Sequence, residues 1–263
     1  MSRLPAPSAT TAARPAGAGF ASKAVPDRIP VWDIAVRTFH WSLVLLVATA
    51  WWTGGSAGRW HEVVGYTVFG LIVFRIAWGF AGTRHALFAH FVKSPLSIIS
   101  YLNQLRSGRA HRFLGHNPAG GAMILALIVC LLVVCNTGWM MQTRRLFGVP
   151  WVEDLHHLAA DAMLVLVPLH IAGVVISSWL HRENLVLAMI TGSKPVQAPA
   201  ERRQAPDTLM RARFERHARH GLAILLLLAV IGASYGWIVT GRRVSTSIPA
   251  PAAEAPEAET PKQ

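Results

Sequence analysis

Apolar residues fall into five long stretches of the chain, separated by shorter polar connections. The stretches run over about residues 34–54, 61–81, 119–141, 155–180 and 222–240. A helix rises about 1.5 Å per residue, so roughly twenty apolar residues cross the hydrocarbon core of a bilayer. The pattern predicts an all-α transmembrane fold. The composition excludes an ordinary soluble domain, because 52% of the residues are hydrophobic and only 14% are charged.

Basic residues are spread unevenly over the connections and indicate the orientation. Residues 82–118 contain five Lys or Arg and no acid, and the segment after the fourth stretch adds eight more. The connection after the first stretch has only Arg59, and the one after the third balances two arginines with two acids. The positive-inside rule therefore predicts a cytoplasmic N-terminus and a periplasmic C-terminus. We interpret the net charge of +12 as a signal of this topology, because the basic residues are concentrated in the connections predicted to be cytoplasmic. No nucleic-acid-binding motif accompanies the charge.

The fourth stretch carries histidines, which lipid hydrocarbon tolerates only when their ring nitrogens have partners. It begins with His156 and His157 and contains His170 further along. His156 and His170 are fourteen residues apart, close to four turns, so both rings leave one helix face roughly 21 Å apart along the axis. The ring of His157 points about 100° away from that face. Two imidazoles arranged in this way suit two stacked haems, and histidines hydrogen-bonded between helices fit the same spacing.

Two further histidines match these depths. His40 lies roughly two turns inside the first stretch, near the cytoplasmic surface, and His61 opens the second stretch near the periplasmic surface. We therefore predict two haem sites, His40 with His170 and His61 with His156. Iron with two axial imidazoles has no open position and passes single electrons. Packing roles for one or more of these histidines are the alternative. The chain has no Cys-x-x-Cys-His motif, so covalent c-type attachment within it is excluded.

Two charged residues lie inside the predicted spans. Arg75 is near the cytoplasmic end of the second stretch, where a haem propionate is one partner for its guanidinium and snorkelling to the headgroups is the other option. Asp161 is the only acid inside the fourth stretch. It can accept a hydrogen bond from a ligand imidazole or from His157, or handle protons from a quinol.

The connection between the second and third stretches contains a short amphipathic helix. Ser94 followed by Pro95 has the form of an N-cap and a first helical position, and Leu96, Ile99, Leu102 and Leu105 recur about one turn apart. We expect this helix to lie on the cytoplasmic leaflet. Asn117 followed by Pro118 starts the third span by the same logic. Four histidines in this basic connection lack metal-ligand spacing and are interpreted as interfacial: His85, His90, His111 and His116.

These motifs together resemble the bacterial cytochrome b561 family, which is related to the cytochrome b subunits of nickel-iron hydrogenases. The resemblance covers about residues 31–195 and rests on VWDIAVRTFHW, HEVVGYTVFGLIVFRIAWGF, FLGHNPAGG and the segment from HHLAADAM to HRENLVLAMITGSKP. It implies four helices that hold two b haems through His40, His61, His156 and His170. The family commonly has His-Glu where this chain has His156 and His157, so His157 stays open as the alternative ligand.

The predicted organisation is a disordered arm (1–30), a four-helix di-haem domain (31–195), a basic cytoplasmic linker (196–220), a fifth transmembrane helix (221–241) and a disordered tail (242–263). The predicted function is transmembrane electron transfer in the bacterial inner membrane. Electrons pass between the quinone pool and a redox partner, either a c-type cytochrome or a hydrogenase-like enzyme. Whether the chain itself oxidises quinol is left open. The alternatives are a haem-free, histidine-bearing transporter or metal-binding protein, and a membrane di-iron oxidase.

Overall fold

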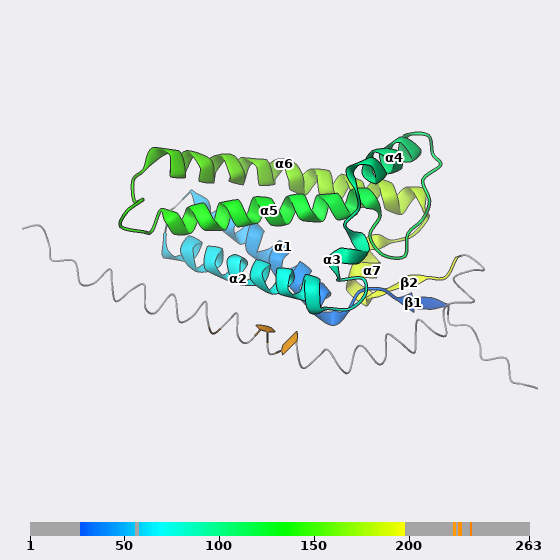
Figure 1. Ribbon diagram of the computed structural model, residues 1–263. Helices are drawn as coiled ribbons and strands as arrows, with labels where there is room; N and C mark the ends of the chain where they lie inside the picture. Colours follow the sequence, from blue (N-terminus) through cyan, green and yellow to red (C-terminus); the bar gives the residue numbers. More distant parts are fainter. Residues whose placement is uncertain (1–26, 56–57, 198–222, 225, 228–231, 233–263) are drawn as a thin grey trace, which may run out of the picture.

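Four long helices run side by side along the molecule (Figure 1). The computed structural model describes residues 27–55, 58–197, 223–224, 226–227 and 232. The long helices are α1 (Ile34–Gly54), α2 (Arg59–Ala81), α5 (Pro118–Met140) and α6 (Pro150–Leu180). Each is long and apolar enough to cross a membrane. Four of the predicted spans are therefore confirmed. The N-terminal arm before residue 27, the tail and most of the linker and fifth span lie outside the described residues.

The four helices pack in the order α1, α2, α5, α6, each antiparallel to the next (Figure 1). The core between them contains Val64, Val68 and Ile72 of α2, Ile128 of α5 and Met163 of α6. The second helix is the central one, because it buries a larger share of its surface than α1 or α6. The outer faces of α1 and α6 are apolar and exposed, as expected for contact with lipid.

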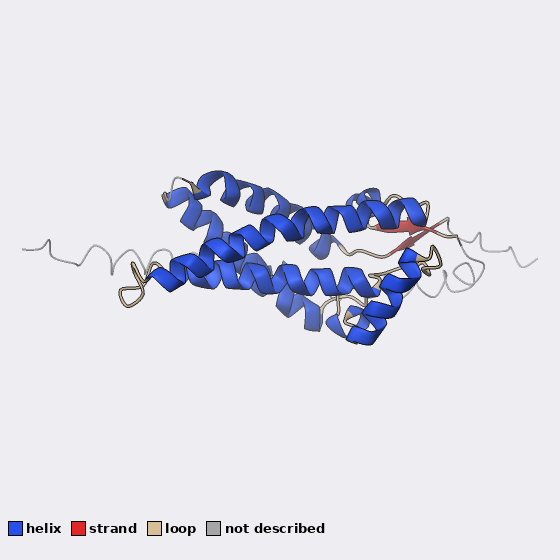
Figure 2. Cartoon of the chain, turned by 90° about the horizontal axis from the view of Figure 1, so that it is seen from above, coloured by secondary structure: helices blue, strands red, loops and turns tan. Residues whose placement is uncertain are grey.

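The two ends of the bundle differ. At one end, α1 joins α2 and α5 joins α6 through short connections, and we call it the hairpin end. The opposite end, which we call the strand end, gathers α3 (Phe88–Phe91), α4 (Pro95–Arg106), α7 (Leu185–Thr191) and the strands β1 (Arg28–Pro30) and β2 (Ser193–Pro195) (Figures 1 and 2). The strands pair antiparallel, with Ile29 opposite Lys194. Exposed Trp52, Trp60 and Trp151 surround the hairpin end, where a membrane–water interface favours them.

Side-chain caps fix where the helices begin. The predicted caps are confirmed: the Ser94 hydroxyl accepts from the Ser97 N–H, and the Asn117 carboxamide accepts from the Gly120 N–H at 2.7 Å. Asp33 caps α1 through Val36 in the same way. Helix α6 begins at Pro150, five residues before the predicted boundary. Proline is favoured in the first turn of a helix, so the polar residues before the apolar stretch form an additional helical turn. Helix α4 exposes Leu96, Ile99 and Leu102, in agreement with an amphipathic surface helix.

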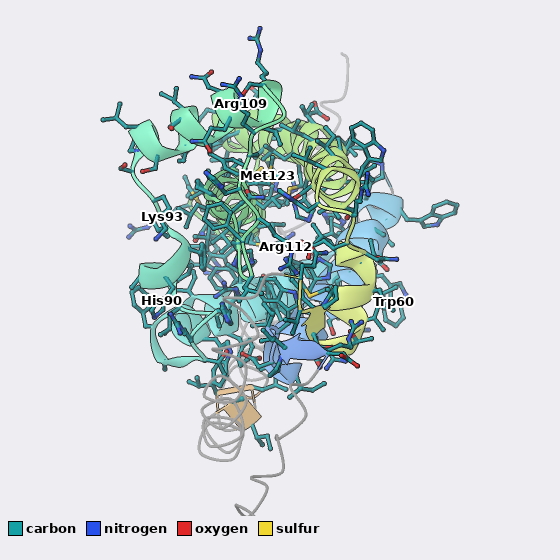
Figure 3. All side chains as sticks on the ribbon, turned by 90° about the vertical axis from the view of Figure 1, so that its right-hand side faces the viewer. Trp60, His90, Lys93, Arg109, Arg112 and Met123 are labelled. Carbon is teal, nitrogen blue, oxygen red and sulfur yellow. The ribbon has the colours of Figure 1, made fainter. Side chains whose placement is uncertain are left out.

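A buried ion cluster ties the strand end together. The Glu183 carboxylate accepts from the Arg112 guanidinium at 2.9 Å and from Lys194 Nζ at 3.0 Å. Lys194 Nζ also donates to the carbonyl of Phe113, and Arg112 to that of Pro195. The connection after α4 is thereby fastened to the segment after α6. Figure 3 looks onto this end and shows Arg112 well inside the outline, with His90, Lys93 and Arg109 towards the periphery.

Candidate functional site

Two of the predicted histidines lie next to each other at the hairpin end, with one ring edge-on to the other. The ring centres of His61 on α2 and His156 on α6 are 6.3 Å apart, and the ring planes are inclined by 81°. A metal–imidazole bond of about 2 Å on each side, with about 1.1 Å from nitrogen to ring centre, gives about 6 Å between two axial imidazoles. The separation therefore suits one metal centre between the two rings.

The Nδ1 atoms of these two rings are already held by the neighbouring helix. His61 Nδ1 lies 3.0 Å from the carbonyl oxygen of Ala50, and His156 Nδ1 lies 3.0 Å from that of Val134. A carbonyl can only accept, so each Nδ1 carries the proton and donates it. The lone pair of each imidazole is then on Nε2. This is the tautomer of a metal ligand whose other nitrogen is oriented by a hydrogen bond.

Two threonine hydroxyls support the same tautomer. Thr53 Oγ1 is 3.4 Å from His61 Nδ1, and Thr137 Oγ1 is 3.1 Å from His156 Nδ1. Each hydroxyl also lies within hydrogen-bonding distance of the carbonyl four residues earlier in its own helix, at 2.8 Å for Thr53 and 2.7 Å for Thr137. With its proton directed to that carbonyl, the threonine oxygen faces the imidazole as an acceptor.

A glycine follows each of these threonines, and each glycine lies close to the Cε1 atom of the neighbouring histidine ring. A Cβ added to Gly54 would lie 3.6 Å from His61 Cε1, and one added to Gly138 would lie 3.2 Å from His156 Cε1. We call the residues Ala50, Thr53 and Gly54, together with Val134, Thr137 and Gly138, the two histidine cradles. The cradles were not predicted from the sequence, although a Thr-Gly pair near the end of both the first and the third span was a visible signal.

His157 points away from this pair. Its side chain is 69% exposed and its Nε2 lies 3.9 Å from a Glu153 carboxylate oxygen, one turn earlier on the outer face of α6. Asp161 is exposed on the same helix, and within the described residues it makes no hydrogen bond to His156 or His157. The geometry thus places His156 rather than His157 opposite His61.

The other predicted pair lies at the strand end. His40 on α1 and His170 on α6 are within electrostatic range of each other. His40 Nδ1 is out of contact with solvent and has no hydrogen-bond partner in the described part of the chain. The pair therefore lacks the carbonyl contacts that hold His61 and His156, so the two ends of the bundle are chemically unequal.

Arg75 is fixed beside this second pair. The side chain is only 4% exposed, and its guanidinium lies over the rings of Phe88 and Phe91, 5.2 and 5.7 Å from their centres. Such cation–π contacts orient the group. Its Nη1 atom is buried without a hydrogen bond to any described residue. Burial excludes the alternative in which Arg75 snorkels to the headgroups.

Two histidines that were predicted to be interfacial are half-buried among aromatic side chains of the strand end. The His116 ring contacts Trp32 and Phe91, at 4.5 and 4.8 Å between ring centres, and its Nδ1 is out of contact with solvent. Burial, with Arg75 and His85 nearby, lowers the pKa of His116 to about 3. Burial, with Arg84 nearby, lowers the pKa of His85 to about 4. Both are therefore neutral near pH 7. The expectation failed because aromatic neighbours far apart in sequence enclose them, while His90 and His111 are exposed as expected.

The residues present fit a tetrapyrrole at each end. Paired imidazoles provide axial nitrogens, and a buried guanidinium with a free N–H provides a partner for a propionate. Gly65 lies one turn after His61, and Gly173 lies one turn after His170. A Cβ added to either glycine would meet nothing within 4 Å, so both leave space beside the histidine-bearing faces. These features define a class: a helical membrane protein with histidine pairs of the haem-binding type.

Comparison with known proteins identifies the family. The family model for prokaryotic cytochrome b561 matches residues 31–192, and the chain belongs to this family. A "probable Ni/Fe-hydrogenase B-type cytochrome subunit" of Rhodobacter capsulatus is 25% identical over 212 residues, which cover 62% of this chain and 80% of that protein. A protein of the same description from Bradyrhizobium diazoefficiens is 26% identical over 212 residues, or 62% of this chain and 85% of its own. No solved structure matches the chain significantly.

The resemblance drawn from the sequence motifs is thereby confirmed, as is the all-α transmembrane fold. The chain is a multi-pass membrane b-type cytochrome that takes part in electron transfer.

Proposed function

We propose that this cytochrome holds two b haems and conducts single electrons from one side of the bacterial inner membrane to the other. His61 and His156 would hold the haem iron at the hairpin end, and His40 and His170 would hold that at the strand end. The observation that carries the proposal is the His61–His156 pair, whose rings are 6.3 Å apart and whose occupied Nδ1 atoms leave Nε2 of each imidazole as the atom that can ligate iron.

Each residue in this arrangement has a defined task. A bound haem supplies a one-electron couple with no open coordination position. The cradle carbonyls hold the protons on Nδ1 of His61 and His156, which keeps both imidazoles in the ligating tautomer and fixes their planes. Leu, Val and Ile side chains of the core exclude water between the two ends. Arg75 offers a charged N–H to a propionate at the strand end.

The partners follow from the topology and from the relatives. The strand end carries the basic connections and is assigned to the cytoplasm by the positive-inside rule, so both His61 and His156 face the periplasm and the C-terminus is periplasmic.

The relatives are described as hydrogenase cytochrome subunits, which supports a hydrogenase-like enzyme or a c-type cytochrome as the periplasmic redox partner. The quinone pool is the second partner. Residues 31–195 form the haem-binding domain, and 221–241 add a fifth span.

Electron transfer in sealed vesicles tests this function. The purified protein is reconstituted into lipid vesicles that contain trapped ferricyanide, and a quinol analogue is supplied in the membrane or a membrane-impermeant reductant outside. We expect α-band absorbance of b haem on reduction and protein-dependent loss of the trapped ferricyanide. A haem-free, histidine-bearing transporter or metal-binding protein would show no b-type band. Full haem content without any transfer across the vesicle membrane would contradict the transmembrane path.

A further inference from the structure

Arg75 carries a positive charge into the protein interior and meets no described acid that is free to pair with it. The acid within electrostatic range is Asp33, whose Oδ1 accepts from the Val36 N–H and whose Oδ2 accepts from Trp78 Nε1 and Thr83 Oγ1. The Glu183 carboxylate is shared between Arg112 and Lys194. A buried guanidinium without an anion is costly. The site therefore requires a negative group that the described side chains do not supply.

His116 provides a second free hydrogen-bonding atom close to Arg75. Both side chains contact the ring of Phe91, the guanidinium at 5.7 Å and the imidazole at 4.8 Å from its centre. The orphaned atoms are Arg75 Nη1 and His116 Nδ1. A buried polar atom without a partner costs about 1–3 kcal/mol, so two of them around one aromatic ring indicate a common missing acceptor.

The protonation state of His116 makes it a suitable donor. Since burial keeps the pKa of this residue at about 3, the ring is neutral and carries a single N–H. A neutral donor can bind an anion without adding to the positive charge of Arg75 and Lys194. The ring is also held in place, because Trp32 and Phe91 pack on it.

We propose that Arg75 Nη1 and His116 Nδ1 together bind one carboxylate, and that this carboxylate is a propionate of the strand-end haem. The inference rests on the proposed function, because it requires a haem held by His40 and His170. His170 and Arg75 are both within electrostatic range of His116, so the two donors lie at the same end of the bundle as the histidines that would hold this haem. His116 is thus a positioning residue of the haem site and not an interfacial histidine.

Infrared difference spectroscopy of the holoprotein tests the proposal directly. The protein is produced with haem labelled by 5-aminolevulinate that carries ¹³C in its carboxyl group, which marks the propionates. Reduced-minus-oxidised spectra then show isotope-sensitive carboxylate bands. The bands of the strand-end haem are those lost in His40→Ala. We expect His116→Phe and Arg75→Gln to shift these bands and leave those of the other haem in place.

The redox titration of the same samples supplies a second readout. Loss of the positive charge in Arg75→Gln stabilises ferric haem. At the wild-type midpoint potential the reduced-to-oxidised ratio of the strand-end haem is expected to fall about tenfold, which corresponds to about 59 mV for a one-electron couple. His116→Phe is expected to lower the ratio less, and His116→Gln, which keeps an N–H donor, to restore the wild-type band. The matched controls are His90→Phe and Arg84→Gln, because both side chains are exposed on the same connection.

The outcomes separate this inference from the function on which it rests. If wild-type protein holds fewer than two haems, the proposed function fails. The second case is a protein that holds two haems. If neither His116→Phe nor Arg75→Gln then changes the labelled bands or the midpoint potential, only the carboxylate site is overturned. In the third case the midpoint potential of the wild type depends on phosphate concentration, and the labelled bands do not change in His116→Phe. This result would assign the site to a free anion and would also overturn the proposal. If His116→Phe does not assemble, the bands of Arg75→Gln and His116→Gln decide between the same results.

Discussion

His156 and His157 are adjacent in the sequence and have opposite surroundings. The imidazole of His156 lies between the Val134 carbonyl and the His61 ring, whereas that of His157 is exposed beside Glu153. Helix periodicity anticipated this difference, because fourteen residues return to the same face and thirteen do not.

We expect His156→Ala to remove one haem per chain and His157→Ala to retain both. The physical reason is that the His156 ring lies 6.3 Å from the His61 ring, whereas the His157 side chain is exposed beside Glu153. Haem-to-protein ratios of the two purified variants, measured from the pyridine haemochrome spectrum, provide the comparison. Loss of a haem in His157→Ala with retention in His156→Ala would reverse the ligand assignment.

Gly138 and Gly54 offer a matched pair of substitutions. An alanine Cβ at Gly138 would come within 3.2 Å of His156 Cε1, whereas one at Gly54 would remain 3.6 Å from His61 Cε1. The first distance forces the ring to move and the second is ordinary van der Waals contact. Both changes raise helix propensity by about 1 kcal/mol, so this contribution cancels between them.

The readout for these glycine variants is the electron paramagnetic resonance spectrum of the oxidised protein. Nearly perpendicular imidazole planes give low-spin ferric haem a strongly anisotropic signal, and the 81° inclination of His61 and His156 predicts one. We expect Gly138→Ala to change this signal more than Gly54→Ala does. An equal response from both variants would show that the His156 cradle is not the tighter one.

At the scale of secondary structure, the four spans and two of the helix caps could be predicted because each leaves a local signal. Twenty apolar residues, or a serine or asparagine before a proline, are readable without tertiary context. The strands, α3 and α7 were missed because three to seven residues carry no periodicity. Burial of His116 depends on Trp32 and Phe91 from other segments, and the Glu183 cluster joins residues up to 83 positions apart. Such contacts exist only in the folded chain.

The Glu183 cluster should be important for stability. Replacement by Gln leaves Arg112 and Lys194 without their carboxylate in a buried place, and removal of one partner of a buried pair costs about 3–5 kcal/mol. We expect Glu183→Gln to lower the thermal denaturation midpoint of the detergent-solubilised holoprotein by several degrees. Glu153→Gln, an exposed acid on α6, is the control and should have little effect. Equal midpoints for the two variants would contradict a stabilising role for the cluster.

For the whole molecule, the two ends predict unequal reduction potentials. Hydrogen bonds from His61 and His156 to backbone carbonyls make these imidazoles more basic and favour ferric iron at the hairpin end. The buried positive charge of Arg75 favours ferrous iron at the strand end.

We therefore expect the haem lost in His40→Ala to have the higher midpoint potential, and the haem lost in His61→Ala the lower one. An optical redox titration of the wild type and both variants measures this order. The reverse order, or two identical potentials, would show that these contacts do not control the couples. The predicted order makes transfer from the hairpin end to the strand end the downhill direction.

The number of haems per chain is the most direct measure of the whole account. A quantitative haem determination on the purified wild-type protein, referred to protein mass by amino-acid analysis, should give two haems per polypeptide. His40→Ala and His61→Ala should give one each, and the double variant none. A wild-type ratio of one or less under conditions that retain native lipid would contradict the presence of a histidine-ligated haem at each end of the bundle.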